Sequence, residues 1–129
     1  MSERVWIDVD LALAIHERLL SRHGGLAGVR DGGLLASALA RPRQIEAYEE
    51  AADSAALSAA HTSGIIRNHP FADGNKRVGF VVGVLFLELN GAVFTASESA
   101  ATAAVYALAA GTVAEAQYAD FLRAQIVGA

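Results

Sequence analysis

Apolar residues recur along this chain at the spacing of amphipathic helices, and strand-like alternation is confined to short pieces such as Val5–Ile7. In the first predicted helix, Leu11, Ile15 and Leu19 form one apolar stripe. About six helices are predicted, near residues 8–22, 31–41, 53–68, 75–89, 97–110 and 112–126. The pattern therefore predicts an all-α fold, with one compact domain over residues 1–129.

Local signals set the ends of these helices. Asp8 or Asp10 is the expected N-cap of the first helix and Asp31 that of the second. Pro42 is expected to stop the second helix, because proline removes a helical donor and clashes with the preceding turn. Thr112–Glu115 has the form of a capping box and is expected to open the last helix.

Composition narrows the class of protein. The 129 residues carry 14 acids against 10 bases, for a net charge of −4, so a broad nucleic-acid footprint is not expected. Cysteine is absent, which excludes disulfides, thiolate nucleophiles and cysteine-based metal sites. We expect no signal segment, because residues 1–6 do not have the charged-then-apolar pattern of one. The apolar run Val78–Leu87 is well short of the roughly 18 residues that suggest a membrane span. We expect a cytoplasmic protein that contacts neither membrane nor nucleic acid.

Residues 69–77, His-Pro-Phe-Ala-Asp-Gly-Asn-Lys-Arg, hold more candidate chemistry than any other stretch. Pro70 disfavours helical geometry at the residue before it, so His69 is expected at a helix exit. Asp73 and Gly74 then turn the chain, and a new apolar helix begins at about Asn75. These nine residues are therefore expected to form a loop that leads into a helix N-terminus.

A helix N-terminus attracts anions, because its backbone amides are unpaired and the helix dipole is positive there. Gly74 allows a phosphate to approach the backbone closely, and Lys76 and Arg77 add two full charges. Asp73 can hold a magnesium ion that neutralises a polyphosphate. His69 can take a proton from an attacking hydroxyl near neutral pH. Together these residue types predict a nucleotide site.

An ordinary turn is the structural alternative. In that interpretation Asp73 is only an N-cap, Pro70 and Gly74 are turn residues, and the two cations are solvated. A plain turn explains each residue singly, but it does not require a histidine, a carboxylate, an amide and two adjacent cations within nine residues. The combination favours the functional interpretation.

The segment resembles the signature of the Fic/Doc family, His-x-Phe-x-(Asp/Glu/Asn)-(Gly/Ala)-Asn-(Gly/Lys)-Arg, and matches every fixed position. The likeness extends over much of the chain and is greatest to the death-on-curing toxins, the small branch of the family. In the family the histidine is the general base, the acidic residue binds the metal, the asparagine and arginine hold phosphates, and the phenylalanine anchors the loop. The resemblance therefore assigns these roles to His69, Asp73, Asn75, Arg77 and Phe71.

Two positions bear on the reaction. Family members that transfer AMP usually carry glycine where Lys76 stands and a second arginine where Phe80 stands. Death-on-curing toxins, which this chain resembles at both positions, transfer the γ-phosphate of ATP instead. By resemblance, the protein uses ATP and Mg²⁺ to phosphorylate a threonine of elongation factor Tu, and so blocks translation. Gly74 is the residue typical of the AMP-transferring members, so AMP transfer to a protein hydroxyl is the alternative.

Some assignments stay open at this point. Arg67 either reaches the nucleotide or the acceptor, or is only a cation near a helix C-terminus. Lys76 either contacts phosphate or only fills space. The polar span of residues 43–50 is either the family's flap, which docks the target, or a connector.

The resemblance also implies a protein partner. Many Fic proteins inhibit themselves through a helix that contains Ser/Thr-xxx-Glu-(Gly/Asn), and this string is absent. We therefore expect inhibition in trans by a Phd-type antitoxin, whose disordered tail would fold into a groove on the toxin. Two other hypotheses are a Fic-fold nucleotide-binding module without catalysis and a purely structural partner of a repressor.

Several other features have ordinary explanations. His16, His23 and His61 lack partners at metal-ligand spacing and are expected to be surface or core histidines. The glycine-rich residues 24–33 lack the ending of a phosphate loop and are expected to connect two helices. The Gly79/Gly83 pair predicts close helix packing.

Overall fold

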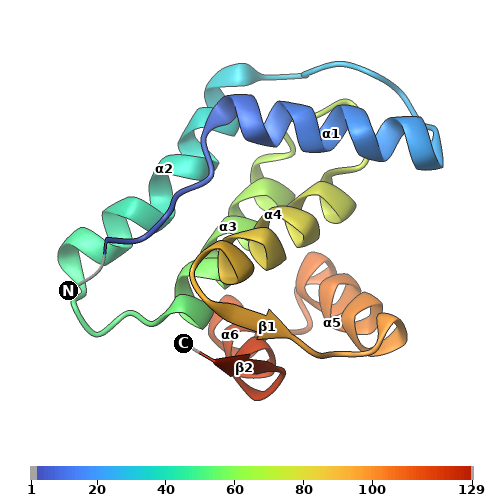
Figure 1. Ribbon diagram of the computed structural model, residues 1–129. Coiled ribbons are helices and arrows are strands. Elements are labelled where there is room, and N and C mark those ends of the chain that lie inside the picture. Colours follow the sequence, from blue (N-terminus) through green and yellow to red (C-terminus); the bar gives the residue numbers. More distant parts are fainter. Residues whose placement is uncertain (1–2, 129) are drawn as a thin grey trace.

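Six α-helices and one small sheet make up residues 3–128, the part of the chain that this computed structural model describes (Figure 1). The helices are α1 (Val9–His23), α2 (Gly32–Tyr48), α3 (Ser54–Asn68), α4 (Asn75–Leu89), α5 (Glu98–Ala110) and α6 (Glu115–Ala124). Strands β1 (Ala92–Phe94) and β2 (Ile126–Gly128) pair antiparallel, with Val93 opposite Val127. The all-α prediction is confirmed. None of the helices in residues 3–128 combines the length and the hydropathy that crossing a membrane requires.

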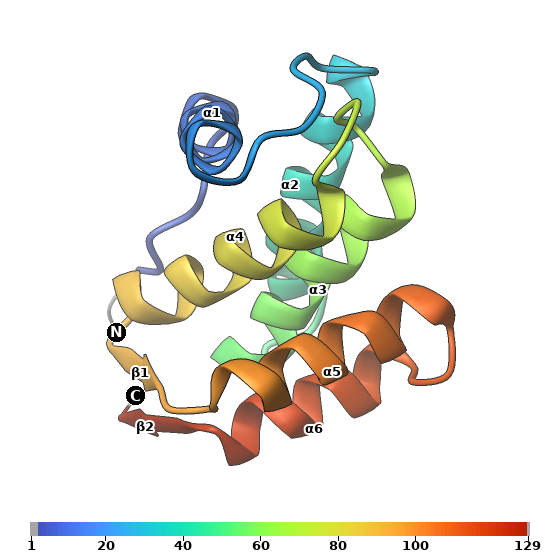
Figure 2. The same cartoon turned by 90° about the vertical axis from the view of Figure 1, so that its right-hand side faces the viewer.

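Helices α3 and α4 form the centre of the molecule, with α1 on one side of the pair and α5 and α6 on the other (Figure 2). Their close approach depends on the two glycines of α4. A Cβ atom on Gly79 would lie 3.1 Å from the Thr62 backbone oxygen, and one on Gly83 would lie 3.0 Å from Ser58 Oγ. The hydroxyls of Thr62 and Ser58 donate to the Gly79 and Gly83 carbonyls, each at 2.8 Å. The predicted glycine packing is confirmed, and it brings α3 and α4, the two helices that residues 69–74 join, into close contact.

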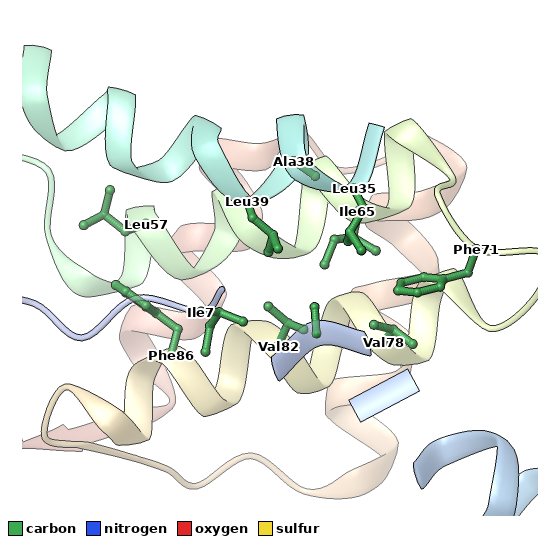
Figure 3. Packing of buried hydrophobic residues seen from close by; sticks show 11 residues of the cluster. Ile7, Leu35, Ala38, Leu39, Leu57, Ile65, Phe71, Val78, Val82 and Phe86 are labelled. Carbon is green, nitrogen blue, oxygen red and sulfur yellow. The ribbon is translucent and has the colours of Figure 1, made fainter. Parts of the chain in front are cut away.

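Buried apolar side chains form two clusters. The first joins the N-terminal segment and helices α1 to α4, and Figure 3 shows its packing. Phe71 lies at one end of this cluster beside Val78, although it belongs to the loop between α3 and α4. The second cluster joins α3 and α4 to α5, α6 and the sheet. The loop before α4 is thus attached to the core through Phe71.

The prediction that Pro42 ends the second helix is wrong, because α2 continues through Pro42 to Tyr48. The apolar stripe explains this outcome. Leu35, Ala38, Leu39 and Pro42 are all buried on one face at helical spacing, so the proline ring packs as part of the core. The free energy gained by burying that face offsets the cost of the backbone hydrogen bond that Pro42 cannot donate.

Residues 43–48 are therefore helical, and the flap interpretation of residues 43–50 is also wrong. Arg4 bonds to Glu46 of α2 and to Ser54 Oγ, at 2.6 Å, so this end of α2 lies beside the first residue of α3. His69 follows the last residue of α3, which has 15 residues and is therefore about 22 Å long. The span lies at the far end of α3 from the motif.

The last helix also begins differently from the predicted capping box. Its N-cap is Ala114, whose N–H donates to Gln117 Oε1 at 2.8 Å. The Thr112 hydroxyl instead donates to the Ala107 carbonyl at 3.1 Å and so belongs to the end of α5. The helix ends at Ala124, because the following residues pair with β1 instead of continuing the helix.

Candidate active site

His69 occupies the position where α3 ends. Its N–H donates to the Ile65 carbonyl at 3.0 Å, and its backbone is left-handed, with φ 51° and ψ 53°. It is the only non-glycine residue with positive φ in residues 3–128. Pro70 explains why the helix stops there. The exposed candidate base thus has an uncommon backbone conformation that its surroundings must maintain.

The segment between α1 and α2 maintains that conformation. Val29 and Phe71 form an isolated antiparallel bridge, and the N–H groups of Arg30 and Asp31 donate to the Pro70 carbonyl at 2.7 and 3.0 Å. The predicted helix connection at residues 24–33 is confirmed, since α1 ends at His23 and α2 begins at Gly32. The same connection also packs against residues 69–77, which we call the motif loop.

Arg30 is a site residue that the sequence interpretation missed. Its guanidinium donates from Nε to the His69 carbonyl at 2.7 Å and from Nη2 to the Asn68 carbonyl at 2.9 Å. These are two of the last carbonyls of α3, which have no helical partner, and a cation is favoured there. The bonded residues are 38 and 39 positions apart, so no local pattern indicated the contact.

Asn75 holds the loop in a closed turn. The Phe71 N–H donates to Asn75 Oδ1, and Asn75 Nδ2 donates to the Phe71 carbonyl, each at 3.0 Å. Asn75 is 4% exposed and Phe71 is fully buried. Phe71 is therefore placed as an anchor would be. Asn75 uses both ends of its amide inside the protein, and its assignment as a phosphate ligand stays a prediction.

Asp73 presents its carboxylate at the exposed side of the loop. Oδ1 accepts from the Gly74 N–H at 2.8 Å, and Oδ2 accepts from the Leu26 N–H at 3.2 Å. Each carboxylate oxygen keeps a further lone pair for a metal. Within residues 3–128 no three His, Asp or Glu side chains are grouped so that they could hold a metal. A single carboxylate fits magnesium, which is usually bound by one or two carboxylates together with substrate phosphates and water.

The start of α4 is open to an anion. Gly74 is its N-cap with φ 81°, and no side chain of the N-cap satisfies the first amides. A shallow depression adjoins this end of α4, and its lining includes His16, Leu20, Gly24 and Arg77. Uncapped amides, a glycine and an arginine at one helix N-terminus form a suitable site for phosphate.

A family model described as the Fic/DOC family matches residues 6–87. The protein kinase doc of Escherichia phage P1 is 36% identical over 111 residues, which cover 86% of this chain and 87% of that protein. The chain belongs to the Fic/DOC family. The toxin Doc of Mycolicibacterium smegmatis is 42% identical over 72 residues, or 53% of each chain.

The two positions that differ between branches of the Fic/DOC family have distinct environments here. Lys76 is exposed, and its Nζ lies 5.5 Å from the centre of the Tyr106 ring on α5, a cation–π contact. Phe80 packs in the second core cluster, where its ring meets Phe94 edge-on at 5.8 Å. An apolar ring therefore occupies the position at which AMP-transferring members usually have a second arginine.

Arg67 is directed toward α6. Its guanidinium donates to Ser63 Oγ at 2.8 Å and lies 3.9 Å from a Glu115 carboxylate oxygen. Burial by itself would raise the pKa of Glu115, but bonds from Arg41 and Ser63 and the charge of Arg67 lower it below the usual range. Arg67 thus has partners apart from the motif loop, and a contact between Arg67 and nucleotide stays a prediction.

The remaining histidines differ from one another. His61 is a core residue: its Nδ1 bonds to the Leu57 carbonyl at 2.8 Å, and its ring lies against Trp6 and Phe86. Burial lowers the pKa of His61 to about 4. His23 is exposed at the end of α1. His16 is buried as well, but it packs against the motif loop.

Proposed function

We propose that this protein is the toxin enzyme of a toxin–antitoxin module and uses ATP with Mg²⁺ to modify a hydroxyl side chain of a target protein. The observation that carries the proposal is the uncapped N-terminus of α4, with Gly74 as its N-cap, Asp73 before it and Arg77 in its first turn. The names of its relatives, protein kinase doc and toxin Doc, support both the toxin role and the chemistry.

In the proposed reaction, the target hydroxyl oxygen attacks the γ-phosphorus of ATP. The bond from that phosphorus to the bridging oxygen of the β-phosphate breaks, ADP leaves, and His69 takes the hydroxyl proton. The amides of α4 and the Arg77 guanidinium hold phosphate oxygens. Magnesium, held by Asp73, would neutralise phosphate charge. His69 is suited to its role because it is exposed beside the loop, while its backbone is held by Arg30.

Phosphorylation is favoured over AMP transfer by Lys76 and Phe80. A lysine at the phosphate site would crowd the nucleotide orientation that AMP transfer requires, and Phe80 supplies no second cation because it lies in the core. Gly74 supports the alternative, since it is the residue typical of AMP-transferring members. The proposed acceptor is a threonine of elongation factor Tu, whose phosphorylation would block translation in the cytoplasm.

The proposed regulator is a Phd-type antitoxin that binds the toxin in trans. Any inhibitor is expected to act from outside, because the given sequence lacks the inhibitory string of self-restrained Fic proteins. Co-purification of the chain with the product of an adjacent reading frame, and loss of growth arrest in its presence, would support this partner. Growth arrest that persists with the neighbour present would contradict it.

A paired transfer assay tests the enzyme. The purified chain, His69→Ala and the control His23→Ala are incubated with elongation factor Tu, Mg²⁺ and ATP that is labelled at the α- or the γ-phosphate. His23 is suited as a control because it is the exposed histidine outside the motif loop. We expect label from the γ-position with the wild type and with His23→Ala, and none with His69→Ala.

Other outcomes of this assay have defined meanings. Label from both positions, lost in His69→Ala, would mean that Lys76 permits the AMP-transfer orientation. Labelling of other proteins in a whole lysate, but not of elongation factor Tu, would change the target. ATP binding without transfer to any protein would favour a nucleotide-binding module without catalysis.

A further inference from the structure

His16 lies on the buried face of α1, yet it contacts the motif loop directly. Its ring stacks on Phe71, with 4.0 Å between ring centres and 17° between planes, and the residue is 4% exposed. Its Nε2 lies 3.1 Å from the backbone oxygen of Asp73. A carbonyl oxygen only accepts hydrogen bonds, so this contact requires the hydrogen on Nε2.

The peptide between Asp73 and Gly74 is therefore held at both of its polar groups. Its oxygen accepts from His16, and its N–H donates to Asp73 Oδ1 at 2.8 Å. In a trans peptide these two groups point in opposite directions, so rotation of the peptide would break both bonds together. The bond from His16 thus also stabilises the orientation of the Asp73 carboxylate, which Leu26 supports at its other oxygen.

We infer that His16 is a positioning residue for the metal–nucleotide site. By holding the Asp73–Gly74 peptide, it keeps the Asp73 carboxylate in the orientation that binds Mg²⁺ with ATP. The inference rests on the proposed function and adds a residue to it. His16 also lines the depression beside α4, together with Gly74 and Arg77, two residues of the proposed phosphate site.

A purely structural role is the competing explanation, because the ring also packs α1 onto Phe71. Two substitutions separate ring from donor. His16→Phe keeps an aromatic ring against Phe71 and removes the hydrogen-bond donor. His16→Gln removes the ring and keeps an amide N–H of similar reach. The packing role requires the ring, whereas the positioning role requires the donor.

The experiment is calorimetric titration of each folded variant with ATP, once in excess MgCl₂ and once in EDTA. We expect His16→Phe to weaken binding about 10-fold with Mg²⁺, and His16→Gln to stay within about 3-fold of the wild type. In EDTA the ATP affinities of the wild type, His16→Phe and His16→Gln should agree within about 2-fold, because His16 acts through the Asp73 carboxylate, which binds the metal. Asp73→Asn should bind ATP with the same affinity in MgCl₂ and in EDTA.

Wild-type affinity in His16→Phe, or an equal loss in His16→Gln, would overturn the inference and leave the proposed function standing. A wild-type protein that binds ATP equally with and without Mg²⁺ would overturn both. A second measurement needs no variant: the ¹⁵N spectrum of the imidazole rings should show the hydrogen of His16 on Nε2. A hydrogen on Nδ1 alone would refute the contact even if His16→Phe did not fold.

Discussion

Replacing Asn75 with alanine should destabilise the whole protein, in addition to weakening nucleotide binding. The substitution removes both partners of the Phe71 backbone, its N–H and its carbonyl, in a place where Asn75 is 4% exposed and Phe71 is fully buried. Each of the two buried polar groups left without a partner costs about 1–3 kcal/mol, so we expect a loss of about 2–6 kcal/mol. With an unfolding entropy of about 0.27 kcal/mol/K for 129 residues, Tm should fall by about 7–22 °C.

The assay is urea and thermal denaturation of the variant without ligand, followed by ATP titration. Asn90→Ala is a matched control, because the Asn90 amide holds the Val5 backbone in the same two-ended way, at 2.8 and 2.9 Å. That contact is exposed and remote from the motif loop, so its loss should cost about 1 kcal/mol and leave ATP affinity unchanged. An unfolding free energy of Asn75→Ala within about 0.5 kcal/mol of the wild type, with weaker ATP binding, would refute the bracing role and favour a direct phosphate ligand.

Three further predictions concern stability and rate. Arg30→Ala should lower the free energy of unfolding by only about 1 kcal/mol, because its bonds to the Asn68 and His69 carbonyls are exposed. The same variant should lower kcat by a larger factor than it raises the Kd for ATP. An unchanged kcat would refute the role of Arg30 in holding His69. Gly83→Ala should lower the free energy of unfolding, measured by urea denaturation, by about 1–3 kcal/mol, because a Cβ atom there would crowd Ser58 and Thr62. Wild-type stability of this variant would show that α3 and α4 can move apart at little cost in free energy. Burial lowers the pKa of His61 from 6.5 to about 4, so the unfolded chain binds the proton first and stability should fall by roughly 3 kcal/mol from pH 7 to pH 4. His61→Asn should flatten that slope in pH-dependent denaturation, and a slope that persists would place its origin elsewhere.

Helix ends were predictable where a short-range cap decides them. Asp8, Asp31 and Asp53 each accept a backbone N–H three residues later, and all three helices begin beside them. The ends of α2 and α6 were not predictable in this way. Pro42 is held in a helix by burial against the core, and the end of α6 is set by pairing with β1, more than 30 residues earlier in the chain. A local signal such as a cap or a proline does not set the helix end where contacts with distant parts of the chain contribute more free energy.

The candidate site divides in the same manner. The loop from His69 to Arg77 was predictable, because the residues that end α3, turn the chain and begin α4 are adjacent in the sequence. Arg30 and His16 were not, since their contacts with the loop span 39 and 57 positions. The role of residues 43–50 stayed open in the sequence for a related reason: polarity alone does not distinguish an exposed helix end from a loop at the site.

The sequence by itself determined which chemical groups meet in one loop and that this loop leads into a helix N-terminus, because both follow from residues within a few positions of each other. Only the tertiary structure decided what holds those groups in place. The packing of α1 and of the segment after it brings His16 and Arg30 onto the backbone of the loop, and each forms hydrogen bonds that exist only when distant parts of the chain are folded together. The functional groups are local in sequence, whereas their orientation depends on long-range packing.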